Sequence, residues 1–125
     1  MISNKELNEI KAIPALIGQG AGILATDSLY APWLWGFVGP NTVSPGYLGD
    51  TWSLETWNRF WSGDNNEERL RLLQTRDHPQ PPMYIYIGES QRLGLPFEKF
   101  IRTAPQLEQI TPHLWKLVDD PRVQP

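Results

Sequence analysis

Five residues, Met83 to Ile87, constrain the fold more than any other stretch of this sequence. They read Met-Tyr-Ile-Tyr-Ile and follow the run from Pro79 to Pro82, whose prolines cannot continue a helix and favour an extended chain. In a strand, the Met and the two Ile side chains face one way and the two Tyr side chains the other. Both faces are apolar, so the sequence predicts an interior strand of a sheet.

The N-terminal residues carry the signals of a helix start. Ser3 and Glu6 form the S-x-x-E capping box, in which each side chain can satisfy a backbone N–H of the first turn. Pro14 has no N–H and disfavours helical geometry at Ile13, so we expect the helix to end or kink there. The glycines that follow predict a flexible turn region: Gly18, Gly20 and Gly22.

The next stretch is rich in β-branched, aromatic and small residues. Ile23 to Val38 is interrupted by Pro32, which favours one or two strands with a connection over a helix. Pro40 to Gly49 contains two Pro, one Asn and two Gly, and therefore predicts a loop of about ten residues.

The middle of the chain predicts a helical hairpin. Thr51 or Ser53 can cap a first helix that runs to Ser62 and ends at Gly63. Asp64 and Glu67 repeat the capping-box pattern for a second helix. On this second helix we expect three arginines to point outward: Arg69, Arg71 and Arg76.

The C-terminal part predicts more helix. Pro96 suits the first turn of a helix, and apolar residues follow it at helical spacing. Pro105 and Pro112 each mark a possible further helix start, with Thr111 as a cap.

These elements predict a single small α+β domain over residues 1–120, with a short β-sheet and helices, and a C-terminal tail over residues 121–125. A mostly α-helical domain with one β-hairpin is the alternative. The expected core comprises Leu7, Ile10, Leu54, Trp57, Leu70, Leu73, Ile85, Ile87, Phe97, Phe100, Ile101, Leu114 and Trp115.

Composition removes several classes of function. The chain has no cysteine, which excludes disulfides and thiol chemistry. Its formal charge of −3 offers no net attraction for duplex nucleic acid or anionic lipid. Leu29 to Gly39, the most apolar stretch, is too short to cross a bilayer, so we do not expect membrane attachment. No signal peptide is recognisable, and we expect a cytoplasmic protein.

The residues that could carry chemistry are few. Asp27 is the only charged residue between Ala12 and Gly49, which favours a paired, capping or functional carboxylate. A small hydrolase or ligand-binding domain using Asp27, His78 or Glu89 is one hypothesis. His113 stands apart from His78 without metal-ligand spacing. We therefore expect no catalysis, no metal and no cofactor.

The aromatic residues favour a different function. Six Trp, four Tyr and four Phe are many for a small domain, and Trp and Tyr dominate protein interfaces. The sequence predicts an accessory or inhibitory protein that binds another protein through Trp33, Trp35, Tyr47 and Trp52. Single-stranded nucleic-acid binding, with bases stacked on the rings and Arg side chains on the backbone, is a second alternative.

Overall fold

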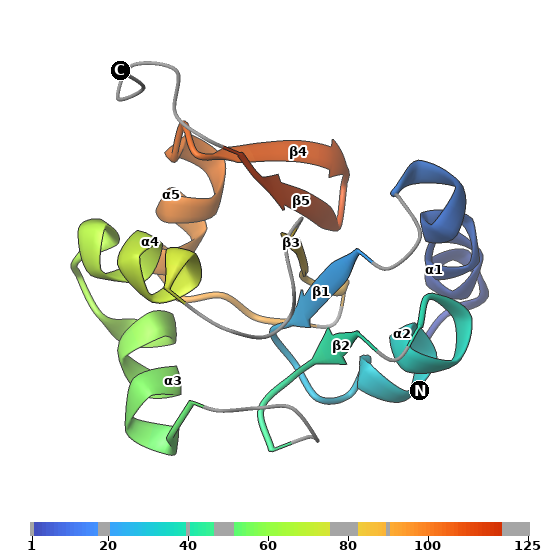
Figure 1. Cartoon of the computed structure of the whole chain (residues 1–125), viewed down its shortest axis with the longest axis horizontal. Coiled ribbons are helices and arrows are strands. Elements are labelled where there is room, and N and C mark those ends of the chain that lie inside the picture. Colours follow the sequence, from blue (N-terminus) through green and yellow to red (C-terminus); the bar gives the residue numbers. More distant parts are fainter. Residues whose placement is uncertain are drawn as a thin grey trace.

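The computed structural model of the chain describes residues 2–17, 21–39, 41–46, 52–75, 83–89 and 91–118. These residues form a mixed five-stranded sheet with helices on both faces (Figure 1). In chain order the elements are α1 (Asn4–Leu16), β1 (Gly22–Ala25), α2 (Ala31–Phe37), β2 (Thr42–Val43), α3 (Leu54–Ser62), α4 (Asn66–Gln74), β3 (Met83–Tyr86), α5 (Leu95–Thr103), β4 (Leu107–Thr111) and β5 (Leu114–Leu117). The α+β class predicted from the sequence is confirmed.

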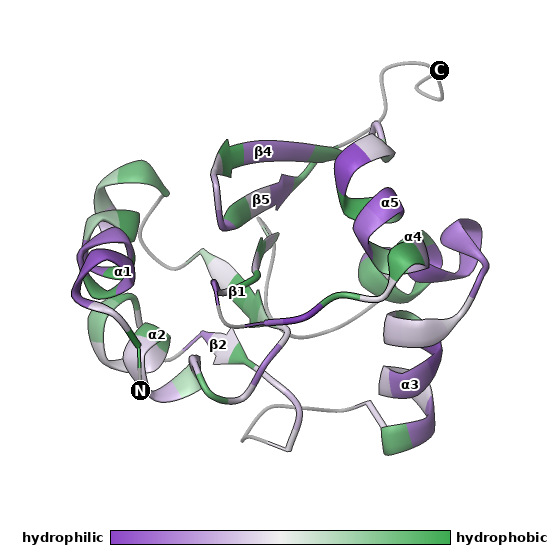
Figure 2. Ribbon diagram, turned by 180° about the vertical axis from the view of Figure 1, so that it is seen from behind, coloured by the Kyte–Doolittle hydropathy of each residue, from purple (hydrophilic) through white to green (hydrophobic). Residues whose placement is uncertain are grey.

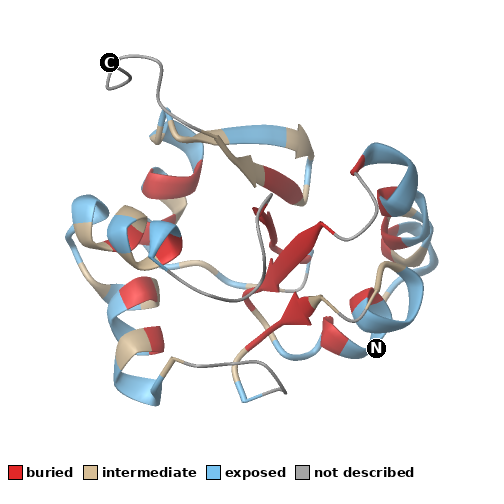
Figure 3. Cartoon of the chain, in the orientation of Figure 1, coloured by how far each residue is buried: buried red, intermediate tan, exposed pale blue. Residues whose placement is uncertain are grey.

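The strands lie in the order β2-β1-β3-β5-β4. β1 pairs in parallel with β2 on one side and with β3 on the other. β5 is antiparallel to β3 and forms a hairpin with β4, which is an edge strand. Figure 3 shows the three parallel strands buried and β4 exposed in its middle and partly buried towards its ends. Figure 2 shows β4 as mostly hydrophilic.

The predicted interior strand is β3, and its two faces are buried in different clusters. Met83, Ile85 and Ile87 lie in a cluster with α3, α4 and α5. Tyr84 and Tyr86 lie in a cluster with α1 and α2 on the opposite face. The alternation of side chains along the strand therefore accounts for the helical layers on both faces of the sheet.

Several helix boundaries follow the predicted capping signals. Ser3 accepts a hydrogen bond from the Glu6 N–H at the start of α1. Ser53 accepts one from the Thr56 N–H at the start of α3, and Gly63 caps the end of that helix. α5 begins with Pro96 in its first turn, also as predicted.

α1 does not end at Pro14. It continues to Leu16, and the Ile17 N–H donates to the Ile13 carbonyl oxygen. Ile10, Ile13 and Ile17 are all buried against the sheet, whereas Pro14 is on the exposed side. Packing of one helix face outweighs the local preference of a proline that faces solvent.

The prediction of strands over Ile23 to Val38 is correct only in part. β1 occupies the first residues, and Gly22, which we expected in a turn, pairs with Met83 as the first residue of this strand. A turn over residues 26–30 follows, and then α2, whose first turn contains Pro32. A proline suits that turn because its fixed φ is helical and its missing N–H needs no partner.

The loop predicted over Pro40 to Gly49 contains the short strand β2. β2 pairs in parallel with β1, which lies about twenty residues earlier in the chain, and local sequence patterns do not reveal a pairing over that separation.

The second predicted helix is α4, and its N-cap lies one residue later than expected. Asn65, rather than Asp64, is the N-cap, and its side chain accepts from the Glu68 N–H. The expected outward direction of Arg69 is also wrong, because this side chain is fully buried, while Arg71 is exposed as predicted.

Arg69 is buried because it connects the three helices of its layer. Its Nε donates to the Phe60 carbonyl oxygen at 2.7 Å, Nη1 donates to Asn66 Oδ1 at 2.8 Å, and Nη2 donates to the Gly63 carbonyl oxygen. The guanidinium also lies over the rings of Phe97 and Phe100 of α5. Burial lowers the pKa of Arg69, although Asp64 and Glu68 oppose this effect.

The helices predicted after Pro105 and Pro112 are the β4–β5 hairpin instead. Thr111 does act as a cap, but of the hairpin turn, where its Oγ1 accepts from the His113 N–H. β5 adds to the edge of β3, so a long-range pairing overrides a helical reading of the local sequence.

The predicted core is largely correct. Leu7 and Leu70 are half-buried, and Leu54 is wrong because its side chain is 77% exposed at the start of α3. Phe60, on the same helix, was not in the expected core and is fully buried. The following residues named above lie outside the described part of the chain: Gly18, Gly20, Tyr47, Thr51, Arg76, His78, Pro79, Pro82 and the tail over 121–125.

Candidate functional site

The carboxyl ends of β1 and β3 are the first place to look for a ligand site. The chain leaves β1 through α2 to reach β2 on one side, and returns through α3 and α4 to reach β3 on the other. In sheets of this kind, the strand order reverses at such a point and leaves a crevice that binds ligands.

In this protein, close contacts join the segments that follow β1 and β3. A Cβ added to Gly88, just after β3, would come within 1.9 Å of the Tyr30 ring, so the ring lies directly on the glycine backbone. Thr26, just after β1, is hydrogen-bonded to Gln91 at 2.9 Å and to the Tyr86 carbonyl oxygen at 3.0 Å. Tyr30 thus packs directly on the backbone that follows β3, while Gly88 and Gln91 also line an open hollow at this end of the sheet.

A buried carboxylate joins α1 to the same end of the sheet. Glu6 is 1% exposed, and its Oε2 accepts from the Tyr86 hydroxyl at 2.6 Å and from the Glu89 N–H at 2.9 Å. Burial, and then the hydrogen bond to Glu6, raise the pKa of Tyr86 far above its ordinary value. The sequence suggested only a capping role for Glu6; its distant partner Tyr86 gives no local signal.

A second carboxylate of α1 holds His113 in the β4–β5 turn. His113 Nδ1 lies 2.5 Å from Glu9 Oε2, and both side chains are mostly buried. The sequence predicted a possible helix start at Pro112, next to His113, and did not connect His113 with Glu9. The pair fixes the orientation of the imidazole ring and ties α1 to the hairpin.

An open hollow of about 340 Å³ lies beside this pair. Its wall includes His113, Trp115 and Glu89, together with the ion pair between Arg102 and Glu98, whose Nε and Oε1 are 3.2 Å apart. Arg102 pairs with Glu98, and His113 pairs with Glu9 of α1, whereas the Glu89 carboxylate forms no ion pair with a described residue. Among the described residues, no side chain of the lining is a nucleophile.

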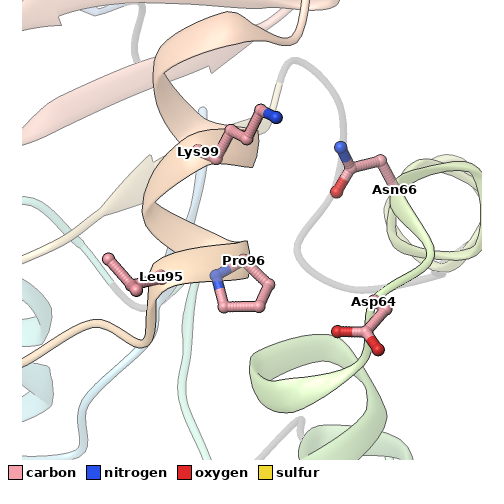
Figure 4. A pocket seen from close by; sticks show the side chains of 5 residues that line it. All are labelled: Asp64, Asn66, Leu95, Pro96 and Lys99. Atoms are coloured by element: carbon pink, nitrogen blue, oxygen red, sulfur yellow. The ribbon is translucent and has the colours of Figure 1, made fainter.

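A second open hollow of about 370 Å³ lies between α5 and the connection of α3 to α4 (Figure 4). Asp64 and Asn66 line one side, and Leu95, Pro96 and Lys99 line the side formed by α5. Asn66 already accepts from Arg69. The hollow is shallow and mostly formed by exposed side chains, which gives little with which to hold a ligand.

The structure describes two of the three residues of the hydrolase hypothesis, Asp27 and Glu89. Asp27 Oδ1 accepts from the Leu29 N–H at 2.9 Å, the local turn role that its neighbours allow. No hydrogen bond or ion pair joins Asp27 to Glu89, and His78 lies outside the described residues. Among the residues that the structure describes, no group of three His, Asp or Glu side chains could hold a metal ion.

Two of the four predicted binding residues lie on the surface of α2. Trp33 and Trp35 are each 37% exposed, and Phe37 at the end of the helix is 43% exposed. We call these three side chains the α2 surface. Ala31 and Leu34, on the opposite side of the helix, are buried against the sheet.

Because α2 is a helix and not the predicted strand, Trp33 and Trp35 do not point in the same direction. An extended segment would point Trp33 and Trp35 the same way. In a helix, residues two apart are separated by about 200°, and residues four apart lie on one face. Trp33 therefore shares a flank of α2 with Phe37, and Trp35 lies on the other flank.

Trp52 belongs to a different part of the molecule. Its ring packs against Trp57 and Phe60, with centroid distances of 4.7 and 5.2 Å, on the α3 side of the sheet. Trp52 is half-buried there and does not extend the α2 surface. Tyr47 lies outside the described residues.

Comparison of the chain with models of protein families, with curated proteins and with solved structures finds no match. Within the described ranges, no helix has both the length and the apolar character that a bilayer-spanning helix needs.

Proposed function

We propose that this chain is a small accessory or inhibitory protein that acts by binding another protein through the α2 surface. The observation that carries the proposal is the exposure of Trp33, Trp35 and Phe37 on one short helix. The helix has no charged residue and shows only pale and hydrophobic colours in Figure 2. Large aromatic side chains of this kind contribute most of the free energy at protein interfaces.

The position of α2 supports the same proposal. Ala31 and Leu34 fix the helix on the sheet, and the Val38 N–H donates to the Leu34 carbonyl oxygen at its end. The exposed rings are therefore presented by a rigid element, and little conformational entropy is lost when they are covered.

The proposal includes no catalysis by this chain and a cytoplasmic location. Tyr30 packs on Gly88 at the carboxyl end of β3, and Asp27 has a local capping role, which supports this part of the proposal. The alternative of single-stranded nucleic-acid binding is weakened because Arg69, one of its expected cations, is buried among α3, α4 and α5.

The test is to isolate the partner with the intact chain, identify it, and measure its dissociation constant with purified variants. We expect Trp33→Ala and Phe37→Ala each to weaken the complex by about 2 kcal/mol, or roughly thirtyfold. Leu54→Ala is the control, because it removes an exposed apolar side chain from α3, on the other face of the sheet. Equal affinity of all three variants would refute the proposal, as would unfolding of the isolated domain by the two α2 substitutions.

A further inference from the structure

The acidic residues that precede α2 have partners within the protein, whereas the nearby Lys11 has no ion pair with a described residue. The three acidic residues before α2 all have partners: Glu6 accepts from Tyr86, Glu9 contacts His113, and Asp27 accepts from the Leu29 N–H. The sequence has no Asp, Glu, Lys or Arg from Ser28 to Gly49. Among the described residues up to the end of α2, each carboxylate therefore has a partner within the protein.

Lys11 is the cation at this surface. It lies on the exposed side of α1, and its Nζ lies 5.2 Å from the centroid of the Phe37 ring. Lys11 forms no ion pair with any described residue. Water and the ring face are what stabilise its charge in the free protein.

Binding at α2 changes the surroundings of this ammonium group. A partner that covers the Phe37 ring also removes water from Lys11, because the two are in contact. An ammonium group that loses its water without gaining an anion is strongly destabilised. The cost disappears when the partner supplies a carboxylate.

We infer that the partner of the α2 surface is a protein segment that combines an apolar anchor for Trp33 and Phe37 with a carboxylate that pairs with Lys11. This inference rests on the proposed function and adds the chemistry of the partner. An acidic side chain beside the anchor gives both the ion pair and the discrimination against basic or uncharged segments.

An anionic membrane presents the same charge but fits less well. Stable attachment to such a membrane needs several basic residues or a deeply inserted apolar face. The α2 surface has one lysine at its edge, and the whole chain has a formal charge of −3. A protein segment needs only one carboxylate at one place.

The experiment is a selection of peptides from a phage-displayed random library with the full chain, followed by affinity measurements on the synthesised peptides. We expect enriched peptides with an aromatic or aliphatic anchor next to Asp or Glu. The Lys11→Glu variant should bind these peptides about tenfold more weakly, and a selection with that variant should enrich Lys or Arg beside the same anchor.

Lys5→Glu is the matched control. Lys5 is also exposed on α1, and six helical positions place it about 120° around the helix from Lys11. The same change of charge at Lys5 should alter the affinity less than twofold. A similar loss in both variants would show a general charge effect and overturn the inference.

The remaining outcomes separate the two proposals. Peptides without acidic residues that lose binding in Trp33→Ala but not in Lys11→Glu would overturn this inference and leave the proposed function intact. A selection that returns no peptide dependent on Trp33 or Phe37 would count against the proposed function itself. Binding of α2 to phosphatidylserine vesicles in place of peptides would overturn both in favour of a membrane.

Discussion

The two faces of the sheet use aromatic side chains in opposite ways. Beneath α3, α4 and α5, Trp57, Phe60 and Phe97 are buried and pack edge to face with centroid distances between 5.2 and 6.2 Å. On the face covered by α1 and α2, aliphatic and tyrosine side chains fill the core, and two tryptophans stay on the surface. The number of aromatic residues therefore does not indicate where an exposed aromatic surface lies. The position of each ring around its helix does.

The polar groups differ between the faces as well. Under α3, α4 and α5, one buried arginine satisfies carbonyl oxygens at a helix end. Under α1, one buried carboxylate, that of Glu6, accepts from the Tyr86 hydroxyl of β3 and from the Glu89 N–H beyond it. Each face thus has an internal polar contact that secures its helices, and substitutions at these contacts measure how much each layer depends on them.

The largest expected effect is at Arg69. Arg69→Ala leaves the carbonyl oxygens of Phe60 and Gly63 without their donor and removes packing over Phe100. We expect it to lower the free energy of unfolding by about 3–5 kcal/mol in urea titrations. Arg71→Ala, an exposed arginine of the same helix, should change it by less than about 0.5 kcal/mol. Equal effects would mean that Arg69 does not secure this layer.

Arg69 also shows where sequence reasoning stops. Capping residues, proline positions and the alternation along β3 act between neighbours in the chain, so α1, α3, α5 and β3 could be predicted. The burial of Arg69 depends on α5, thirty residues away, and the β4–β5 hairpin depends on pairing with β3. The same limit applies to the site: Trp33 and Trp35 could be named, but their separation around α2 required the helix itself.

The next expected effect is at the close contact between Gly88 and Tyr30. Gly88→Ala inserts a Cβ where the rigid Tyr30 ring already lies, and we expect a loss of about 2–3 kcal/mol in the free energy of unfolding. Gly36→Ala is the control within α2, because a Cβ there meets nothing within 4 Å. It should stabilise the protein by about 0.5–1 kcal/mol, since alanine favours helix. A neutral Gly88→Ala would show that Tyr30 moves freely.

The contact between Tyr86 and Glu6 predicts a dependence of stability on alkaline pH. The pKa of Tyr86 is raised in the folded protein, whereas an unfolded tyrosine ionises near about 10. The contribution of Tyr86 is therefore fully present below that pH and is lost as the pH rises above it. The loss is about 1.4 kcal/mol per pH unit for this single proton.

Unfolding in urea at several pH values between neutral and strongly alkaline measures this slope. Tyr86→Phe should unfold more easily at neutral pH, by about 1–2 kcal/mol, because Glu6 loses a donor in a buried place. The variant should also show a shallower decline at alkaline pH. Identical slopes for the two proteins would mean that Tyr86 ionises in the folded state as it does in the unfolded chain.

The smallest expected effect tests the comparison of the two faces directly. Trp35→Ala removes a ring from the surface of α2, and we expect the free energy of unfolding to change by about 1 kcal/mol or less. Trp57→Ala removes a buried ring of the same kind from α3 and should cost about 3–5 kcal/mol. Thermal unfolding followed by circular dichroism compares them under one set of conditions. If the two losses were equal, the ring on α2 would belong to the core, and α2 would offer a partner much less surface than its exposure indicates.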